Sequence, residues 1–450
     1  MPDRSARVLI SPAAVRLRTG LLIVIFGCIA LPGSLRAADP LAPDEVRSIV
    51  QEILADAAAR SSLLESNARA GHDGKFFVSS SDGGFRLNIG GWIQARYVLN
   101  FHDFTDPDRE DGFESGFQLR RTKLSFEGHL FDPSLIFKIQ GSFDRDGGVF
   151  ELDDAYIGKR FEGGRSAQAG QFKVPLLREE LISDTFQLTA ERSLVNAVFT
   201  QERSQAVQGA WRGDHLGLTA AFSDGVRSLN SDLGDVRQQS RGMPNAGEAD
   251  YALTGRLEWL LAGEWNQFRD FSSPEGAAFA AMLGLAAHAE GADGAHTDFS
   301  DGYYRMIIWT ADLSLEGDGW NAYAAGVGRH SHVSGGTEAP FSGDTGLDDY
   351  GFLAQGGFFI PGTQLEPFAR YELLIADTAD RGVSSSQRTF NIITVGFNWF
   401  MHGHASRFTC DVLWFLDDAT PLAGTTTGIP YLAGTAADQV SVRLQWQLIF

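Results

Sequence analysis

The sequence has few cysteines and no apolar run long enough to cross a membrane as a helix. Of its two cysteines, Cys28 lies in an N-terminal apolar segment, so only Cys410 remains once that segment is removed. One cysteine excludes an intramolecular disulfide and a cysteine metal cluster. A spanning helix needs ~20 apolar residues. A mature chain that lives in a membrane must therefore be a closed β-barrel, in which all backbone polar groups are paired.

Basic residues are also scarce. The formal net charge is −20, which argues against a nucleic-acid partner, because nucleic-acid binding needs basic patches. Lysine occurs only in the first half of the chain, at Lys75, Lys123, Lys138, Lys159 and Lys173. The 33 Phe, 9 Trp, 9 Tyr and 51 Gly instead suit a barrel with aromatic girdles and glycine-rich turns.

The N-terminus has the pattern of a signal peptide. Four arginines between residues 4 and 18 precede an apolar core over residues 21–31, and the small residues Ala37 and Ala38 follow. This pattern predicts export and cleavage after a signal peptide of residues 1–38. Acylation at Cys28 stays open as an alternative, by analogy with lipid-anchor motifs.

Residues 39–67 predict a short amphipathic helix in the periplasm. Asp44 is suited to cap it, and Val46, Ile49, Val50, Ile53 and Leu54 form an apolar stripe at helical spacing. The stripe fits a short coiled coil that drives oligomerisation, or a helix that rests on its own protein. Residues 68–84 are polar and rich in Gly and Ser, so we expect a linker there.

From residue 85 to 450, apolar and polar residues alternate with a period of two, which predicts an all-β fold. In the first strand Ile89, Ile93 and Ala95 alternate with Gln94 and Arg96. The expected strands cover residues 86–99, 117–131, 134–144, 149–161, 164–174, 204–212, 215–224, 250–261, 277–290, 304–315, 319–330, 348–360, 364–376, 387–400, 404–417 and 438–450. Their lengths match tilted transmembrane strands of roughly 9–11 residues.

The connections alternate between short and long. Tight turns follow the even-numbered strands, except at 262–276, and long segments such as 100–116 and 175–203 follow the odd-numbered ones. Outer-membrane barrels are built in this way. We therefore expect a transmembrane antiparallel β-barrel of about sixteen strands over residues 85–450 in the outer membrane. The terminal Phe450 closes an alternating strand, as is common in such barrels.

Several stretches resemble the phosphate-selective porin O and P family. They are Phe117-Gln118-Leu119-Arg120-Arg121, Asp154-Ala155-Tyr156-Ile157 and Gly170-Gln171-Phe172-Lys173-Val174-Pro175. The resemblance implies a trimeric sixteen-stranded barrel that passes small anions through a basic eyelet. The chain departs from the family in having no lysine after Lys173.

Strand parity predicts which charged side chains face the lumen. Arg or Lys on the lipid face costs ~2–4 kcal/mol at the membrane midplane, so these residues should point inward. The predicted pore-lining and anion-binding residues are Arg96, Arg121, Lys123, Lys138, Lys173, Arg256 and Arg443. Two interpretations remain open, a salt-bridged wall that selects nothing and a basic wall that attracts anions.

The long segment 175–203 is the predicted constriction loop. It carries Arg178, Arg192 and Arg203 beside several glutamates. Folded inward, it would narrow the pore and set selectivity. The alternative is an ordinary mobile surface loop.

No catalytic or metal-binding pattern stands out, and we expect no enzyme activity, no metal and no cofactor. The histidines lack zinc-ligand spacing, and no nucleophile or phosphate-binding motif follows a suitable strand. The sequence thus predicts a porin for passive diffusion of small hydrophilic solutes, favouring phosphate or similar anions. Its expected partners are outer-membrane lipid, small anions and two further copies in a homotrimer. A structural, cell-wall-tethering or adhesive barrel, or a general or sugar porin, is the alternative.

Overall fold

A computed structural model of the protein describes most of the chain. The described residues are 48, 51–52, 68–104, 113–143, 147–225, 249–293, 303–336, 343–377, 388–417 and 436–450. The predicted signal peptide lies outside them. Of the predicted helix at 39–67, only residues 48, 51 and 52 are described, and all three are helical. Within the described part of the chain, no helix is long and apolar enough to cross a membrane.

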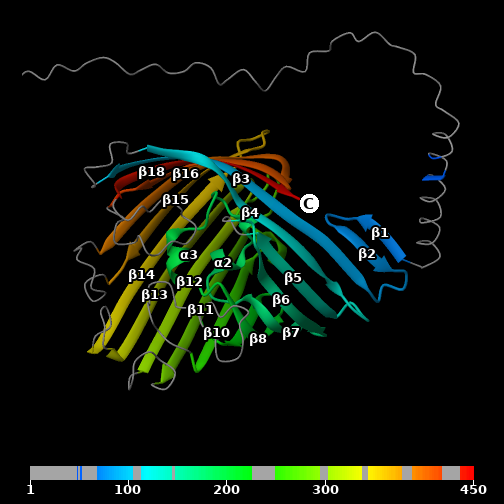
Figure 1. The fold of residues 1–450 in the computed structure, drawn as a ribbon, viewed down its shortest axis with the longest axis horizontal. Coiled ribbons are helices and arrows are strands. Elements are labelled where there is room, and N and C mark those ends of the chain that lie inside the picture. Colours follow the sequence, from blue (N-terminus) through cyan, green and yellow to red (C-terminus); the bar gives the residue numbers. More distant parts are fainter. Residues whose placement is uncertain are drawn as a thin grey trace, which may run out of the picture. The chain divides into compact units, whose positions relative to one another are not determined.

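Sixteen antiparallel strands, β3 to β18, form a closed barrel (Figure 1). Each pairs with the next along the chain, and β18 pairs with β3. Their bounds are β3 Arg86–Phe104, β4 Phe113–His129, β5 Leu135–Phe143, β6 Phe150–Phe161, β7 Arg165–Lys173, β8 Arg203–Arg212, β9 Leu216–Ser223, β10 Tyr251–Ala262, β11 Ala280–Asp293, β12 Tyr303–Gly317, β13 Trp320–Gly336, β14 Gly343–Phe358, β15 Leu365–Ile375, β16 Thr389–His404, β17 Ser406–Phe415 and β18 Ala436–Ile449. The predicted fold class and strand number are confirmed.

The period-two pattern separates a lipid face from a lumen face. Large apolar side chains such as Phe117, Val207 and Trp309 stay exposed on the outer wall. The alternate positions carry polar and charged side chains, of which Arg96 and Arg443 are buried inside the barrel. An apolar exterior around a polar interior is the arrangement that a membrane barrel requires.

Short turns and long connections lie at opposite ends, as predicted. One end carries turns such as 162–164, 213–215 and 318–319, and the other carries connections such as 174–202. The predicted exception is present: the segment between β10 and β11 is long and contains the 3-10 helix η2, Trp265–Arg269.

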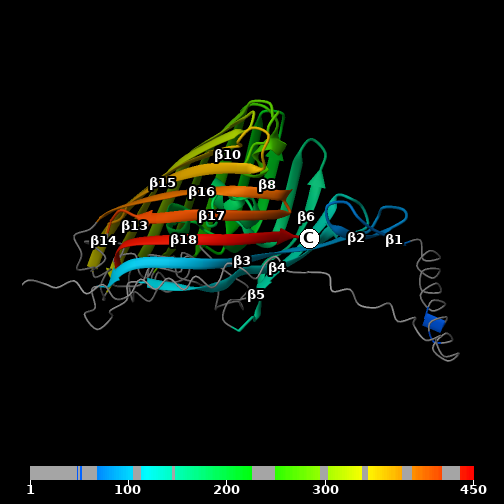
Figure 2. The same ribbon diagram turned by 90° about the horizontal axis from the view of Figure 1, so that it is seen from above.

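Residues 68–84 differ from the expected linker, because they form a hairpin. It consists of β1 Ala68–His72 and β2 Phe76–Ser80, and β2 pairs with the first residues of β3. The 19-residue β3 extends past the end of β18, where the backbone of Phe450 bonds Gly91 in both directions. β2 then pairs the edge that β18 leaves open (Figure 2), because unpaired strand edges are unfavourable.

Gly170 lies where two neighbouring strands of the barrel wall approach closely, and a substitution there tests how much this close approach matters for stability. Its φ of +133° is in a region that other residues rarely adopt, and an added Cβ would lie 2.1 Å from the carbonyl oxygen of Ala155. Gly170→Ala should destabilise the folded barrel by at least about 1–3 kcal/mol, the usual cost of such a strained conformation.

Urea titration of heat-modifiable gel migration measures this loss. Gly209→Ala is the matched control, because a Cβ at Gly209 meets nothing within 4 Å. Equal stability of the two variants would contradict the account.

Candidate functional site: the constriction

The segment between β7 and β8 folds into the barrel rather than over its surface. It contains α2 Arg178–Leu181, the 3-10 helix η1 Asp184–Phe186 and α3 Leu194–Phe199. Side chains of Ser183 and Ser193 accept backbone N–H bonds at the starts of η1 and α3. Figure 1 shows α2 and α3 against the inner side of the strands. We call residues 174–202 the inner loop.

One face of the inner loop is apolar and covers half of the barrel wall. Leu176, Leu194 and Phe199 pack in one cluster with side chains from β11 to β17, including Tyr304 and Phe390. Ile182 and Leu188 join a second cluster with Phe271, Tyr323, Leu353 and Phe368. On this side the interior is a packed core.

Polar side chains of the same wall hold the loop backbone at residues 187–190. The Arg407 guanidinium donates to the carbonyl of Gln187 at 2.8 Å. Asn398 donates to Leu188 at 2.9 Å, and Asp411 accepts from the Ala190 N–H at 3.0 Å. These bonds satisfy buried backbone groups that have no helix or strand partner.

A β-bulge in β4 turns two consecutive arginines inward. Gln94 pairs with Arg121 and Ala95 pairs with Leu119, so Arg120 is the extra residue. Strand parity alone places Arg120 on the lipid face, whereas its guanidinium bonds Glu191 inside the barrel. Sequence reasoning therefore missed Arg120 as a lumen residue.

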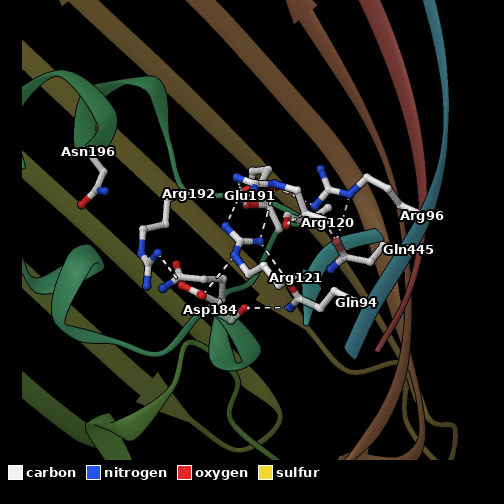
Figure 3. A network of polar contacts seen from close by, with 12 residues as sticks. Gln94, Arg96, Arg120, Arg121, Asp184, Glu191, Arg192, Asn196 and Gln445 are labelled. Carbon is white, nitrogen blue, oxygen red and sulfur yellow. Dashed lines mark hydrogen bonds and ion pairs between the residues drawn. The ribbon is translucent and has the colours of Figure 1, made fainter. Parts of the chain in front are cut away.

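Glu191 of the inner loop is the centre of this basic cluster (Figure 3). Its Oε1 lies 2.7 Å from Arg96 Nη2 and its Oε2 lies 2.7 Å from Arg121 Nη2, while Arg120 Nε also bonds Oε1. Burial alone raises the pKa of Glu191, but the three guanidinium groups outweigh burial and hold this pKa well below its ordinary value.

Asp184 forms a neighbouring set of ion pairs between the inner loop and the barrel wall. Its carboxylate lies 3.0 Å from Arg121 Nε, 2.5 Å from Arg192 Nη1 and 3.4 Å from Lys123 Nζ. Burial opposes ionisation of Asp184, yet these cations keep its pKa well below 3.8. Figure 3 shows Asp184 between Arg121 and Arg192. The predicted loop residue Arg192 is thus part of the constriction.

A second bulge, in β6, places two consecutive acids in the lumen. Gln140 pairs with Asp154 and Gly141 with Leu152, so Asp153 is the extra residue. Gln171 donates to the carbonyls of Leu152 and Asp153 at 3.0 and 2.8 Å, which satisfies the backbone at the bulge.

The two acids pair with lumen cations. Lys123 lies 2.8 Å from Asp153, Lys138 lies 2.8 Å from Asp154, and Arg203 Nε lies 2.6 Å from Asp154. Lys173 lies 2.9 Å from Glu180 of the inner loop. The predicted basic residues of β4 to β8 therefore gather around one side of the inner loop, each beside an acid.

Cations are more exposed than acids at this constriction. The side chains of Arg120, Arg121, Lys123, Lys138, Lys173, Arg192 and Arg203 are 10–22% exposed. Those of Asp153, Asp154, Glu180, Asp184 and Glu191 are 4–14% exposed. In each of these pairs the cation is the more exposed partner, except for Lys123 at 10% beside Asp153 at 14%.

Four of the predicted site residues lie away from this surface. Arg256 and Arg443 point inward, but the inner loop covers them and they form bidentate pairs with Asp312 and Asp411. Arg178 is buried and donates to the Phe268 carbonyl at 2.8 Å. Arg96 is buried behind Glu191. These four side chains position the inner loop and offer solutes little or no contact.

Residues 93–254 match the phosphate-selective porin O and P family. This range runs from β3 to the start of β10, and it includes both bulges and the whole inner loop. The resemblance inferred from the sequence is confirmed over this range. No curated protein matches the chain.

The chain is similar to solved structures of other proteins. The outer membrane channel DcaP of Acinetobacter baumannii is 14% identical, with a TM-score of 0.52, over 81% of this chain and 97% of DcaP. OprB of Pseudomonas putida is 9% identical, with a TM-score of 0.45, over 87% of this chain and 96% of OprB. The DcaP likeness shows that this chain has the barrel fold of an outer-membrane channel.

Among the residues that the structure describes, no group of three or more histidine, cysteine or acidic side chains is placed to hold a metal ion.

Glu191→Gln tests how the inner loop is attached. The change leaves the buried Arg96 and the partly exposed Arg120 and Arg121 without their shared acid, and removing one partner of a buried pair costs about 3–5 kcal/mol. We expect the loop to detach from β3 and β4, which should give larger and noisier single-channel currents. Glu162→Gln, in an exposed turn, is the control. Unchanged currents in Glu191→Gln would show that the apolar face alone holds the loop.

The same pairing predicts resistance to acid. The pKa of Glu180 falls to about 2 because Arg192 and Lys173 outweigh its burial, and those of Asp184 and Glu191 are also depressed. Their stabilisation is present above the ordinary pKa and is lost only as pH falls through the depressed value. Single-channel conductance should therefore change little as pH falls from 7 through 4.5. A transition centred near 4.5 would contradict the pairing.

Proposed function

We propose that the protein is an outer-membrane channel for passive diffusion whose constriction favours small anions, phosphate among them. The observation that carries this proposal is the greater exposure of cations over acids beside the inner loop. Fixed cations at a narrow point attract anions and repel cations. The family match and the fold shared with a channel support the coarser part of the proposal.

The charge count at the constriction points the same way. The seven cations and five acids whose exposures are compared above carry a formal excess of two positive charges among them. In a narrow, low-dielectric pore such an excess acts over the whole cross-section. The net charge of −20 of the chain does not oppose this, because exposed acids in loops are screened within about 8 Å at physiological salt.

Lys138 is the most informative residue to change. It is the most exposed cation of the constriction, and its partner Asp154 keeps Arg203 when Lys138 is removed. Lys138→Gln therefore removes a pore charge without leaving an unpaired buried acid. Lys159→Gln is the matched control, because Lys159 lies near the short-turn end and pairs with Asp132.

Reversal potential across a planar bilayer under a KCl gradient measures the effect. We expect anion selectivity in the wild type and a clear shift towards neutrality in Lys138→Gln, with no shift in Lys159→Gln. Phosphate added to the chloride solution should reduce the chloride current if phosphate occupies the same path. A cation-selective potential would refute the anion preference. No conductance at all would favour the structural or adhesive barrel.

We further propose that the mature protein is a homotrimer, as the family resemblance implies, and that it has no catalytic activity, because its sequence carries no catalytic motif. Residues 1–38 would be removed on export, and residues 39–67 would lie in the periplasm. Intact mass of the purified protein and its mass in solution test the cleavage point and the number of copies.

A further inference from the structure

A row of small residues crosses the outer wall of the barrel. Strand pairing aligns Lys159 on β6 with Ala167, Gly209, Ala220, Gly255 and Ala287 on the next five strands. These positions face outward, because they lie on the same face of the strands as exposed apolar residues such as Val207 and Leu253, two residues away. A Cβ added at Gly209 or Gly255 would meet nothing within 4 Å. The row is therefore the floor of a groove.

Bulky side chains border the groove on both sides. Ile157, Val207 and Phe222 lie two residues away on one side, and Trp211, Leu218 and Leu285 lie on the other. Two adjoining hollows of about 650 and 700 Å³ follow the groove, and both are lined by Gly209 and Ala220. Their walls are almost wholly apolar.

The groove runs from the short-turn rim into the membrane. Lys159 lies two residues before the end of β6 at Phe161, whereas Ala287 lies seven residues beyond the start of β11 at Ala280. The far end is therefore five residues deeper, or about 16 Å along the strands. The rim of short turns in such barrels is at the periplasmic face.

Two cations stand at the rim end of the groove. Arg165 is the first residue of β7, on the same face as Ala167 and diagonal to Lys159 across the strand pair. Lys159 pairs with Asp132 at 3.2 Å and stays 41% exposed. Arg165 has no ion-pair partner among the described residues. Arg165, Lys159 and Asp132 together carry one net positive charge, and the exposed Glu162 lies in the adjoining turn.

We propose that this groove binds an anionic phospholipid of the periplasmic leaflet. The head-group phosphate lies against Arg165 and Lys159, and one acyl chain follows the row of small residues upward. The Arg165 guanidinium, which has no ion-pair partner among the described residues, matches the single negative charge of phosphatidylglycerol. The groove begins at the level of the lipid head groups and continues into the hydrocarbon region of the membrane. An acyl chain attached to a head group at the rim would follow this course, whereas contact with a second protein copy would not require it.

Native mass spectrometry of delipidated protein in detergent tests this site. Dioleoyl phosphatidylglycerol and dioleoyl phosphatidylcholine are the probes. The wild type should bind one phosphatidylglycerol more tightly than phosphatidylcholine. Arg165→Gln and Lys159→Gln should each lower the affinity for phosphatidylglycerol about fivefold, the usual effect of one cation at an anionic surface. Neither variant should change the affinity for phosphatidylcholine.

Filling the groove should remove both lipids. Gly209→Ile places a branched side chain on the floor of the groove, so we expect the affinity for either lipid to fall at least tenfold. Gly326→Ile is the matched control, because Gly326 faces outward on β13 and its Cβ would also meet nothing within 4 Å. Heat-modifiable migration checks that both variants fold, and the two rim variants, which leave the floor intact, test the site if either does not.

Several outcomes would overturn the proposal. They are equal wild-type affinity for the two lipids, full binding by Gly209→Ile, and displacement of the lipid by inorganic phosphate. A fourth is a loss of subunits in Gly209→Ile with unchanged lipid binding, which would assign the groove to a second copy. The channel proposal is independent, because none of these residues belongs to the constriction and conductance should be unaffected.

Discussion

The interior of this barrel depends on the neutralisation of buried charge. An ionised group that leaves water costs several kcal/mol unless a partner of opposite charge compensates it. The inner loop carries Glu180, Asp184 and Glu191 into the barrel, and the wall supplies cations to each of them. The loop and the wall are therefore stable only together. The apolar face of the same loop fills the opposite half of the interior, so one segment provides both the packed half and the charge pattern of the constriction.

The two β-bulges are the devices that make this neutralisation possible. An extra residue in one strand rotates its side chain to the face that its neighbour already occupies. Arg120 thereby joins Arg121 in the lumen, and Asp153 joins Asp154. Both bulges fall in or beside stretches that carry the family resemblance, and Gln171, from the third such stretch, satisfies carbonyls at the second bulge. These three sequence stretches thus have a structural reason: they bring additional charged side chains to the constriction.

Much of the fold could be predicted from the sequence, because period two and turn length are local properties. The strand ends at 149–161 and 438–450 were predicted to within about two residues, and the inward course of residues 175–203 was anticipated. The hairpin at 68–84 was not, because its pairing depends on how far β3 outruns the C-terminus. Arg120 was missed because one extra residue leaves no mark in composition. Strand parity predicts that Arg256 and Arg443 point inward. It cannot predict that the inner loop covers them, because that depends on tertiary packing.

The most direct test of the account is the charge preference of a thiol placed at the constriction. Ser142 is inward on β5, opposite Lys123, and bonds Asp153 at 3.2 Å. In a Cys410→Ser background, Ser142→Cys would react with anionic and cationic methanethiosulfonate reagents of similar size, with rates normalised to a free thiol in solution. The account predicts that the anionic reagent reacts faster. Equal rates, or a faster cationic reagent, would show that the acids rather than the cations face the solute path.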